Sequence, residues 1–205
     1  MKTFMTRFIR WYALEIYTVI SLVFLTGAGI AGNPSFAQKA IMVYTLLFVL
    51  HEWEEARYPG GFLDKVVSRV TGVTASEELK RASRIPTGIL LLTFSMVPYF
   101  FDDQPLFLMV ATNLCVFEGL IHVIGIRLAG LDIPYTPGMV TAELELIAGI
   151  YVYARLADSG LLTATNILSG LLLFIACFVV MQRSLLAMAG KGYGDIAKTI
   201  KSRKV

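Results

Sequence analysis

Charged residues are scarce in this chain, and histidine and cysteine are scarcer still. Asp, Glu, Lys and Arg make up 16% of the 205 residues, and there are two histidines and two cysteines. Soluble domains carry about 25% charged residues, so the deficit excludes an ordinary soluble fold. Cys115 and Cys177 both lie in apolar runs, which excludes a disulfide framework. The chain also lacks a phosphate-binding glycine loop, a serine-triad signature and a basic nucleic-acid patch, so we expect no nucleic-acid partner.

Hydrophobic residues, by contrast, make up 56% of the chain and gather in runs of roughly 20 residues, the length that crosses a bilayer. Such runs predict membrane-spanning helices, because a helix pairs its own backbone polar groups in hydrocarbon. We therefore predict an all-α fold, a polytopic transmembrane helix bundle that forms a single domain over residues 1–205. About six spans are expected, at residues 11–31, 39–58, 86–101, 105–128, 139–157 and 161–181.

Loops that carry Lys and Arg alternate with loops that carry almost none. Basic residues precede the first span, fill the segment 59–84, end the fourth span at Arg127 and follow the sixth span in a basic tail over 190–205. The intervening loops carry aspartates, with Lys39 the only nearby cation. By the positive-inside rule, this pattern predicts that the N- and C-termini are both cytoplasmic. We expect a multi-pass protein of the bacterial inner (cytoplasmic) membrane, with its tail near anionic headgroups.

Two segments lie outside this pattern. Residues 1–37 also resemble a cleavable signal peptide, because basic residues and an apolar stretch precede Ser35-Phe36-Ala37. The apolar run is long for a signal peptide and carries Trp11 and Glu15 at its start, which favours retention as the first span. In the segment 74–84, Ser76 is expected to cap a short surface helix.

Both histidines lie inside predicted spans, and each has a carboxylate four residues away. His51 and Glu55 share a face at the end of the second span, together with Glu54. Glu118 and His122 share one face of the fourth span. Because ionisable residues inside a membrane are costly, such groups mark a functional site.

The fifth span opens with further polar residues. Thr141 and Glu145 are spaced i, i+4, whereas Glu143 points nearly opposite and suits the positive end of a helix. With a rise of about 1.5 Å per residue, the second, fourth and fifth spans place their His and Glu residues in one slab of the cytoplasmic leaflet. Glu15 could join this group from the first span, while Glu52 is expected to point elsewhere.

Two imidazoles with two or three carboxylates match the ligands that zinc, iron or manganese accepts. We therefore expect a divalent metal ion as cofactor, held by His51, Glu55, Glu118 and His122, with Glu54 as the alternative to Glu55. A glutamate outside this ligand set, Glu54 or Glu145, would act as the catalytic base.

The segment 47–142 carries a longer series of motifs: His51-x-x-Glu54-Glu55, Asn113, His122 and Tyr135-x-Pro137-Gly138-x-x-Thr141-Ala142. In order and spacing, this series resembles the HxxEE family of small integral membrane proteins. The resemblance implies a site at these positions but names no reaction, and Glu118, Glu143 and Glu145 stand outside its pattern.

The resemblance adds Asn113, Pro137 and Gly138 as supporting residues. Prolines and a glycine form a tight turn before the fifth span, from which the Tyr135 hydroxyl can reach the cluster. Tyr135 and Thr141 therefore join the catalytic candidates. On a straight helix Asn113 points about 180° away from His122, which favours a packing role for it.

These observations favour a metal-dependent integral membrane enzyme, with hydrolysis of a lipid or other small amphiphile as the first hypothesis. A metal-free proton relay, in a small transporter or an acid-base isomerase, is an alternative, although the apolar outer halves of the spans disfavour a through-path. A second alternative is a non-catalytic assembly factor, in which a glutamate pairs with Arg57 and a histidine lies close to Arg127.

Three other classes of protein are disfavoured. Two histidines are too few for a histidine-rich desaturase, and the surrounding carboxylates disfavour a haem site. The Glu-x-x-x-His spacing also departs from the Glu-x-x-His spacing of di-iron bundles. The oligomeric state has no signal in the sequence.

Overall fold

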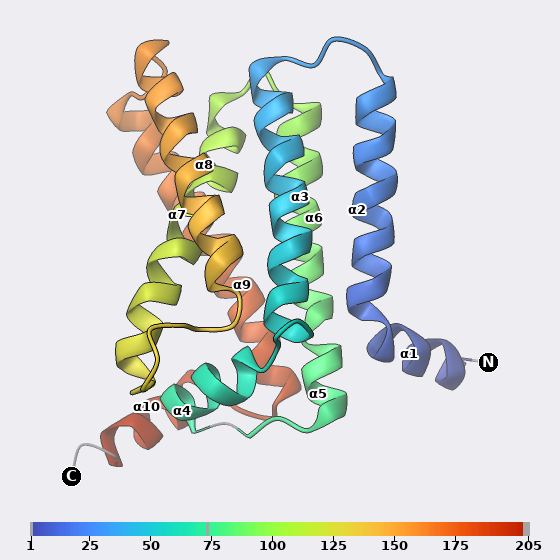
Figure 1. Cartoon of the computed structure of the whole chain (residues 1–205), viewed down its shortest axis with the longest axis vertical. Coiled ribbons are helices and arrows are strands. Elements are labelled where there is room, and N and C mark those ends of the chain that lie inside the picture. Colours follow the sequence, from blue (N-terminus) through green and yellow to red (C-terminus); the bar gives the residue numbers. More distant parts are fainter. Residues whose placement is uncertain (1, 73, 203–205) are drawn as a thin grey trace.

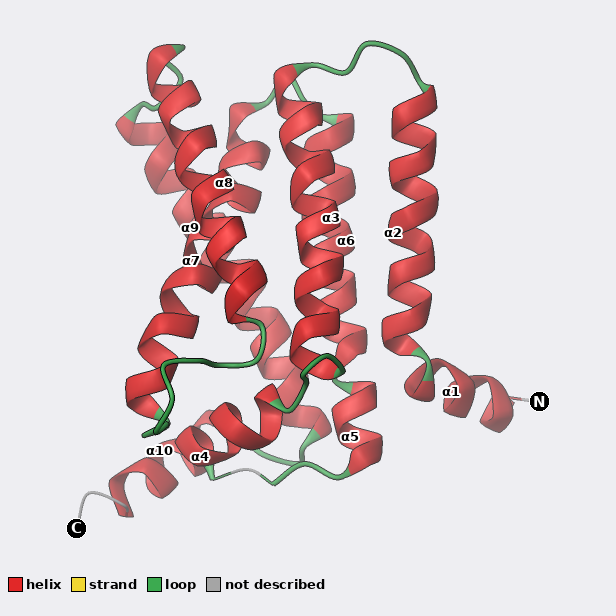
Figure 2. Cartoon of the chain, in the orientation of Figure 1, coloured by secondary structure: helices red, strands yellow, loops and turns green. Residues whose placement is uncertain are grey.

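The computed structural model describes residues 2–72 and 74–202, and within these ranges the chain forms helices and no strand (Figures 1 and 2). Each predicted span corresponds to one long helix. These helices are α2 (Ala13–Ile30), α3 (Phe36–Ala56), α6 (Arg84–Phe100), α7 (Pro105–Leu128), α8 (Met139–Asp158) and α9 (Ala164–Met188). The shorter elements are α1 (Lys2–Trp11), the π-helical turn η1 (Leu63–Val67), α4 (Ser68–Thr71), α5 (Glu77–Ala82) and α10 (Tyr193–Ser202).

The largest difference from the predicted boundaries is at α9, which continues past the expected end at residue 181 to Met188. Polar residues such as Gln182 and Arg183 end an apolar run but do not end a helix. The helix stops instead before Gly190, which has a left-handed backbone with a φ of 65°.

Three of the long helices, α2, α7 and α9, are long and apolar enough to cross a membrane. Their outward faces are apolar: α9, for example, exposes Leu168, Leu172 and Val180. Helices α3 and α8 carry more ionisable residues, and α6 is shorter, with 17 residues. The chain is thus a helical protein with membrane-span candidates, and six spans with cytoplasmic termini stay a prediction.

Helix α3 lies at the centre of the bundle and packs against α2, α6 and α8, while α7 packs between α8 and α9 (Figure 1). The buried core includes Tyr44 and Phe48 from α3 and Met109 from α7. The crossing of α7 and α8 is close, since a Cβ atom at Gly119 would lie 2.5 Å from Cβ of Leu146. Small residues allow this approach between helices, and it brings the polar residues of α7 and α8 together.

The short helices α1, α4, α5 and α10 all lie at one end of the bundle (Figure 1). Helix α1 contacts α5, where Arg10 Nη1 donates a hydrogen bond to Glu78 Oε1 over 3.2 Å. The predicted cap of α5 is confirmed, because the Ser76 side chain accepts a hydrogen bond from the Leu79 backbone N–H. Part of the predicted basic tail, residues 203–205, lies outside the described residues.

Candidate metal centre

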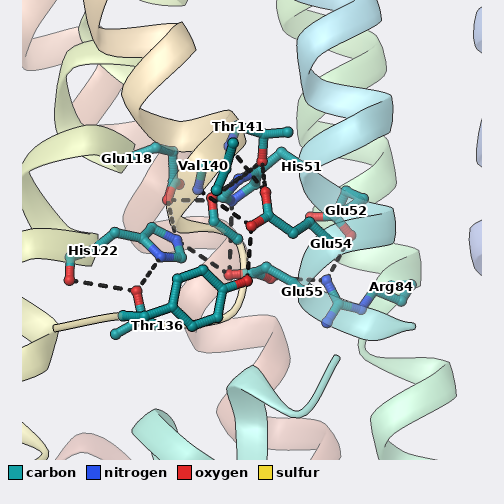
Figure 3. A network of polar contacts seen from close by, with 12 residues as sticks. His51, Glu52, Glu54, Glu55, Arg84, Glu118, His122, Thr136, Val140 and Thr141 are labelled. Atoms are coloured by element: carbon teal, nitrogen blue, oxygen red, sulfur yellow. Dashed lines mark hydrogen bonds and ion pairs between the residues drawn. The ribbon is translucent and has the colours of Figure 1, made fainter. Parts of the chain in front are cut away.

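The last turn of α3 directs its polar side chains toward three neighbouring helices (Figure 3). His51 and Glu55 face Glu118 and His122 of α7. Glu52 faces the start of α6, and Glu54 faces the start of α8. Four polar residues within five positions can reach three helices because successive side chains on a helix are about 100° apart.

His51, Glu55 and His122 form a compact group of ligand atoms. Oε1 of Glu55 lies 3.7 Å from Nε2 of His51 and 3.5 Å from Nε2 of His122. One ligand atom from each of the three residues lies within 4.8 Å of the other two, and all three residues are buried. Glu118 lies beside this group, with Oε2 at 3.8 Å from His51 Nε2 and 3.9 Å from His122 Nε2 (Figure 3). The structure therefore brings these four predicted residues together, and the role of Glu118 as a metal ligand stays a prediction.

Both imidazoles are held by their other ring nitrogen. Nδ1 of His51 lies 3.1 Å from the Gly138 carbonyl oxygen and 3.0 Å from Thr141 Oγ1. A carbonyl oxygen only accepts, so Nδ1 of His51 carries a proton, and in the neutral imidazole Nε2 keeps the lone pair that a metal ion binds. Nδ1 of His122 lies 2.8 Å from Thr136 Oγ1, and Thr136 Oγ1 lies 3.5 Å from the His122 carbonyl oxygen, to which it can donate. Such contacts fix the orientation of metal-binding histidines.

The arrangement fits a metal ion. Nε2 of His122 is buried and has no hydrogen-bond partner among the described residues, and a buried acceptor left alone costs about 1–3 kcal/mol. Around a tetrahedral ion with bonds of about 2.0–2.2 Å, neighbouring ligand atoms lie roughly 3.3–3.6 Å apart. The separations of 3.5 and 3.7 Å from Glu55 Oε1 come close to this range. His51, Glu55 and His122 can thus hold a metal ion.

A buried arginine fixes the other oxygen of Glu55. Arg84 Nη1 donates to Glu52 Oε2 over 2.7 Å and to Glu55 Oε2 over 3.0 Å (Figure 3). Glu52 does point away from the histidines, as predicted, but it takes part in the cluster through Arg84. The expectation that Glu15 could join the cluster is wrong, because Glu15 Oε1 pairs with Arg57 Nη2 at 2.8 Å.

Glu54 connects α3 to the first turn of α8. Its carboxylate accepts hydrogen bonds from the Tyr135 hydroxyl (2.9 Å) and the Val140 backbone N–H (3.2 Å). It also accepts from Thr141, through the backbone N–H at 2.9 Å and Oγ1 at 2.6 Å. Backbone N–H groups at a helix start have no partner within the helix. By accepting from two of them, Glu54 stabilises the start of α8 and fixes its position against α3. This geometry favours a positioning role, and proton transfer by Glu54 stays a prediction.

Two residues of the predicted site lie apart from the ligand group. Asn113 accepts a hydrogen bond of 2.5 Å from the Tyr153 hydroxyl, which agrees with the packing role that its direction on the helix favours. Glu145 is fully buried, and neither carboxylate oxygen has a hydrogen-bond partner among the described residues. Of the two candidates in α8, it is Glu145 that lines the same cavity as Glu118.

That cavity has a volume of about 400 Å³, within the range of ligand-binding sites, roughly 300–1,000 Å³. Its polar end includes His51, Glu55, Glu118 and Glu145. The rest of the wall is largely apolar, with side chains from α4, α6, α7 and α9. A ligand with one polar end and an apolar body would match this distribution.

The ionisation of Tyr135 should make the stability of the folded protein depend on pH in the alkaline range. Burial, followed by the hydrogen bond to Glu54, raises its pKa from 10 to about 12. The folded protein therefore keeps the phenol protonated where the unfolded chain has lost the proton, and this stabilisation is lost as pH rises from 10 to 12. Thermal unfolding of wild-type protein and Tyr135→Phe should show a steeper loss of stability in wild type over this window. Stability that falls equally in wild type and Tyr135→Phe over this pH range would contradict the raised pKa of Tyr135.

Comparisons of the chain with protein-family models, with curated proteins and with solved structures found no match, so the resemblance to the HxxEE family stays a prediction and the assignment of chemistry rests on the geometry of the site.

Proposed function

We propose that this protein is a metal-dependent hydrolase of the bacterial inner membrane that acts on a lipid or other amphiphile. In this proposal the chain crosses the membrane about six times, with both termini and the His/Glu cluster toward the cytoplasm. The observation that supports it most is the convergence of two oriented imidazoles and one carboxylate, His51, His122 and Glu55, on one buried point. The apolar cavity that opens from this point supports an amphiphile as substrate.

Two histidines and one glutamate are the protein ligands of several catalytic zinc sites, and iron and manganese also accept them. Such sites keep a fourth position open for water or substrate. When bound, the metal would polarise the scissile bond and make water more acidic. Arg84 and Glu52 hold Glu55 in place, while Thr136 and Thr141 hold the two imidazoles.

Glu118 is the carboxylate best placed to move the proton. Its Oε2 faces both imidazoles, but it lies outside the compact ligand group, so we assign it to general-base catalysis in place of the ligand role expected from the sequence. In the proposed reaction, water adds to the scissile carbonyl or phosphoryl centre and gives a proton to Glu118. The bond to the leaving group then breaks, and Glu118 returns the proton to that group.

The proposal is tested by incubating purified protein with amphiphilic esters, amides and phosphate esters and measuring product release. We expect hydrolysis of at least one class, its loss on chelation and its recovery with zinc, iron or manganese. Glu118→Gln should lower kcat by about 10²–10⁴-fold while the bound metal content stays unchanged. Glu78→Gln, a change at an exposed residue of α5 that pairs with Arg10 and does not line the cavity, is the control and should keep full activity. Hydrolysis that survives complete metal removal would contradict the proposal.

A further inference from the structure

One residue of the cavity wall, Glu145, has a buried carboxyl group that no other described residue satisfies. This side chain comes from the second turn of α8, has no exposed surface and lines the apolar cavity. Both of its oxygens are buried and have no hydrogen-bond partner among the described residues. Its position follows from the close crossing of α7 and α8, where Gly119 lies against Ala142 and Leu146.

A buried carboxylate without a partner is costly, and the cost is removed when a cation lies beside it. No basic side chain in the described part of the chain bonds Glu145. Arg84 is the one basic side chain on the cavity wall among the described residues, and its Nη1 already bonds Glu52 and Glu55. The remaining ionisable groups of the wall are the carboxyl groups of the glutamates and the imidazole of His51.

Four glutamates and one arginine thus share a cavity wall whose other side chains are mostly apolar. Phe48, Phe117 and Phe178 are among the side chains that line it. Aromatic rings pack against alkyl chains and also attract cations through their faces. An anionic headgroup would be repelled by a carboxylate at Glu118 or Glu145, and a neutral one could donate a hydrogen bond to Glu145 but could not offset its charge. An ammonium does both.

We infer that the cavity binds a cationic amphiphile, with its ammonium group at Glu145 and its alkyl chain along the walls formed by α7 and α9. This inference rests on the proposed function, because it names the class of substrate that the metal centre would act on. The ammonium would satisfy Glu145 and hold the reactive part of the molecule near Glu118 and the histidines.

The test uses full-length protein in dodecyl maltoside and measures binding of octylammonium by calorimetry at neutral pH, well below an amine pKa of about 10.4. The comparison ligands are 1-octanol, with the same tail and no charge, octanoate, with the opposite charge, and ammonium chloride, with no tail. We expect octylammonium to bind at least about tenfold more tightly than 1-octanol. Glu145→Gln should remove this difference and leave 1-octanol binding unchanged, whereas the control Glu143→Gln should keep it.

Equal affinities of wild-type protein for octylammonium and 1-octanol would overturn the inference, and so would tightest binding of octanoate or an unchanged preference in Glu145→Gln. The metal content of the same preparations separates this result from the proposed function. Metal-loaded protein without a preference for the cation would refute the cationic substrate alone. Metal-free protein, unable to take up metal but still selective for octylammonium, would refute the metal-dependent reaction alone.

Discussion

Gly138→Ala is expected to abolish metal binding and to destabilise the protein by about 2–4 kcal/mol. Gly138 has a φ of 95°, which L side chains rarely adopt. An added Cβ would lie 2.7 Å from Cγ of Glu55, 2.7 Å from Cε1 of His122 and 2.9 Å from Cε1 of His51. One methyl group would therefore push against all three ligands of the candidate centre. Thermal unfolding and elemental analysis of the purified variant measure both effects.

Gly130→Ala is the matched control. Gly130 also has a positive φ, 58°, but an added Cβ would meet no atom within 4 Å. This variant should show only the backbone cost, about 1 kcal/mol, and should keep its metal. Equal losses in the two variants would show that backbone strain, and not the contact with the ligands, explains the effect at Gly138.

Arg84→Ala is expected to cost about 3–5 kcal/mol, because it leaves two buried carboxylates without their cation. Arg84, Glu52 and Glu55 are all buried, and Arg84 Nη1 is shared between the two glutamates at 2.7 and 3.0 Å. The loss should appear in chemical or thermal unfolding in detergent. Arg84→Lys, which keeps the charge, should recover much of the stability.

Arg57→Ala provides the comparison with an accessible ion pair. Arg57 bonds Glu15 at 2.8 Å, but about a third of each side chain is exposed, 31% and 34%. Such a pair contributes about 0–1 kcal/mol, so the variant should unfold nearly as wild type does. Similar losses for Arg57→Ala and Arg84→Ala would contradict the buried network described for Arg84.

Much of the helical architecture could be predicted because it follows from local composition. The fourth span was predicted at residues 105–128, and α7 has these bounds, since Pro105 begins the helix and the apolar run fills it. The pairing of His51 with Glu55, and of Glu118 with His122, follows from i, i+4 spacing on single helices. Spacing along one helix also predicted that Asn113 points away from His122, where its side chain bonds Tyr153.

Contacts between helices could not be predicted in this way. Glu52 points away from the histidines, as helical geometry requires, but only the placement of α6 puts Arg84 beside it. The sequence places Arg84 in a basic loop and assigns it to membrane topology. Thr136 supports His122 from the loop between α7 and α8, and no local pattern marks that contact. The roles of these residues depend on the rotation and distance of neighbouring helices.

The central claim is that His51 and His122 hold one metal ion between α3 and α7, and elemental analysis of purified protein tests it most directly. We predict about one equivalent of zinc, iron or manganese in wild-type protein, and its loss in both His51→Ala and His122→Ala. Glu15→Gln, which changes the partly exposed pair with Arg57, should keep the metal. Wild-type protein without metal, even after reconstitution with each ion, would contradict the account and leave the cluster as a metal-free proton relay.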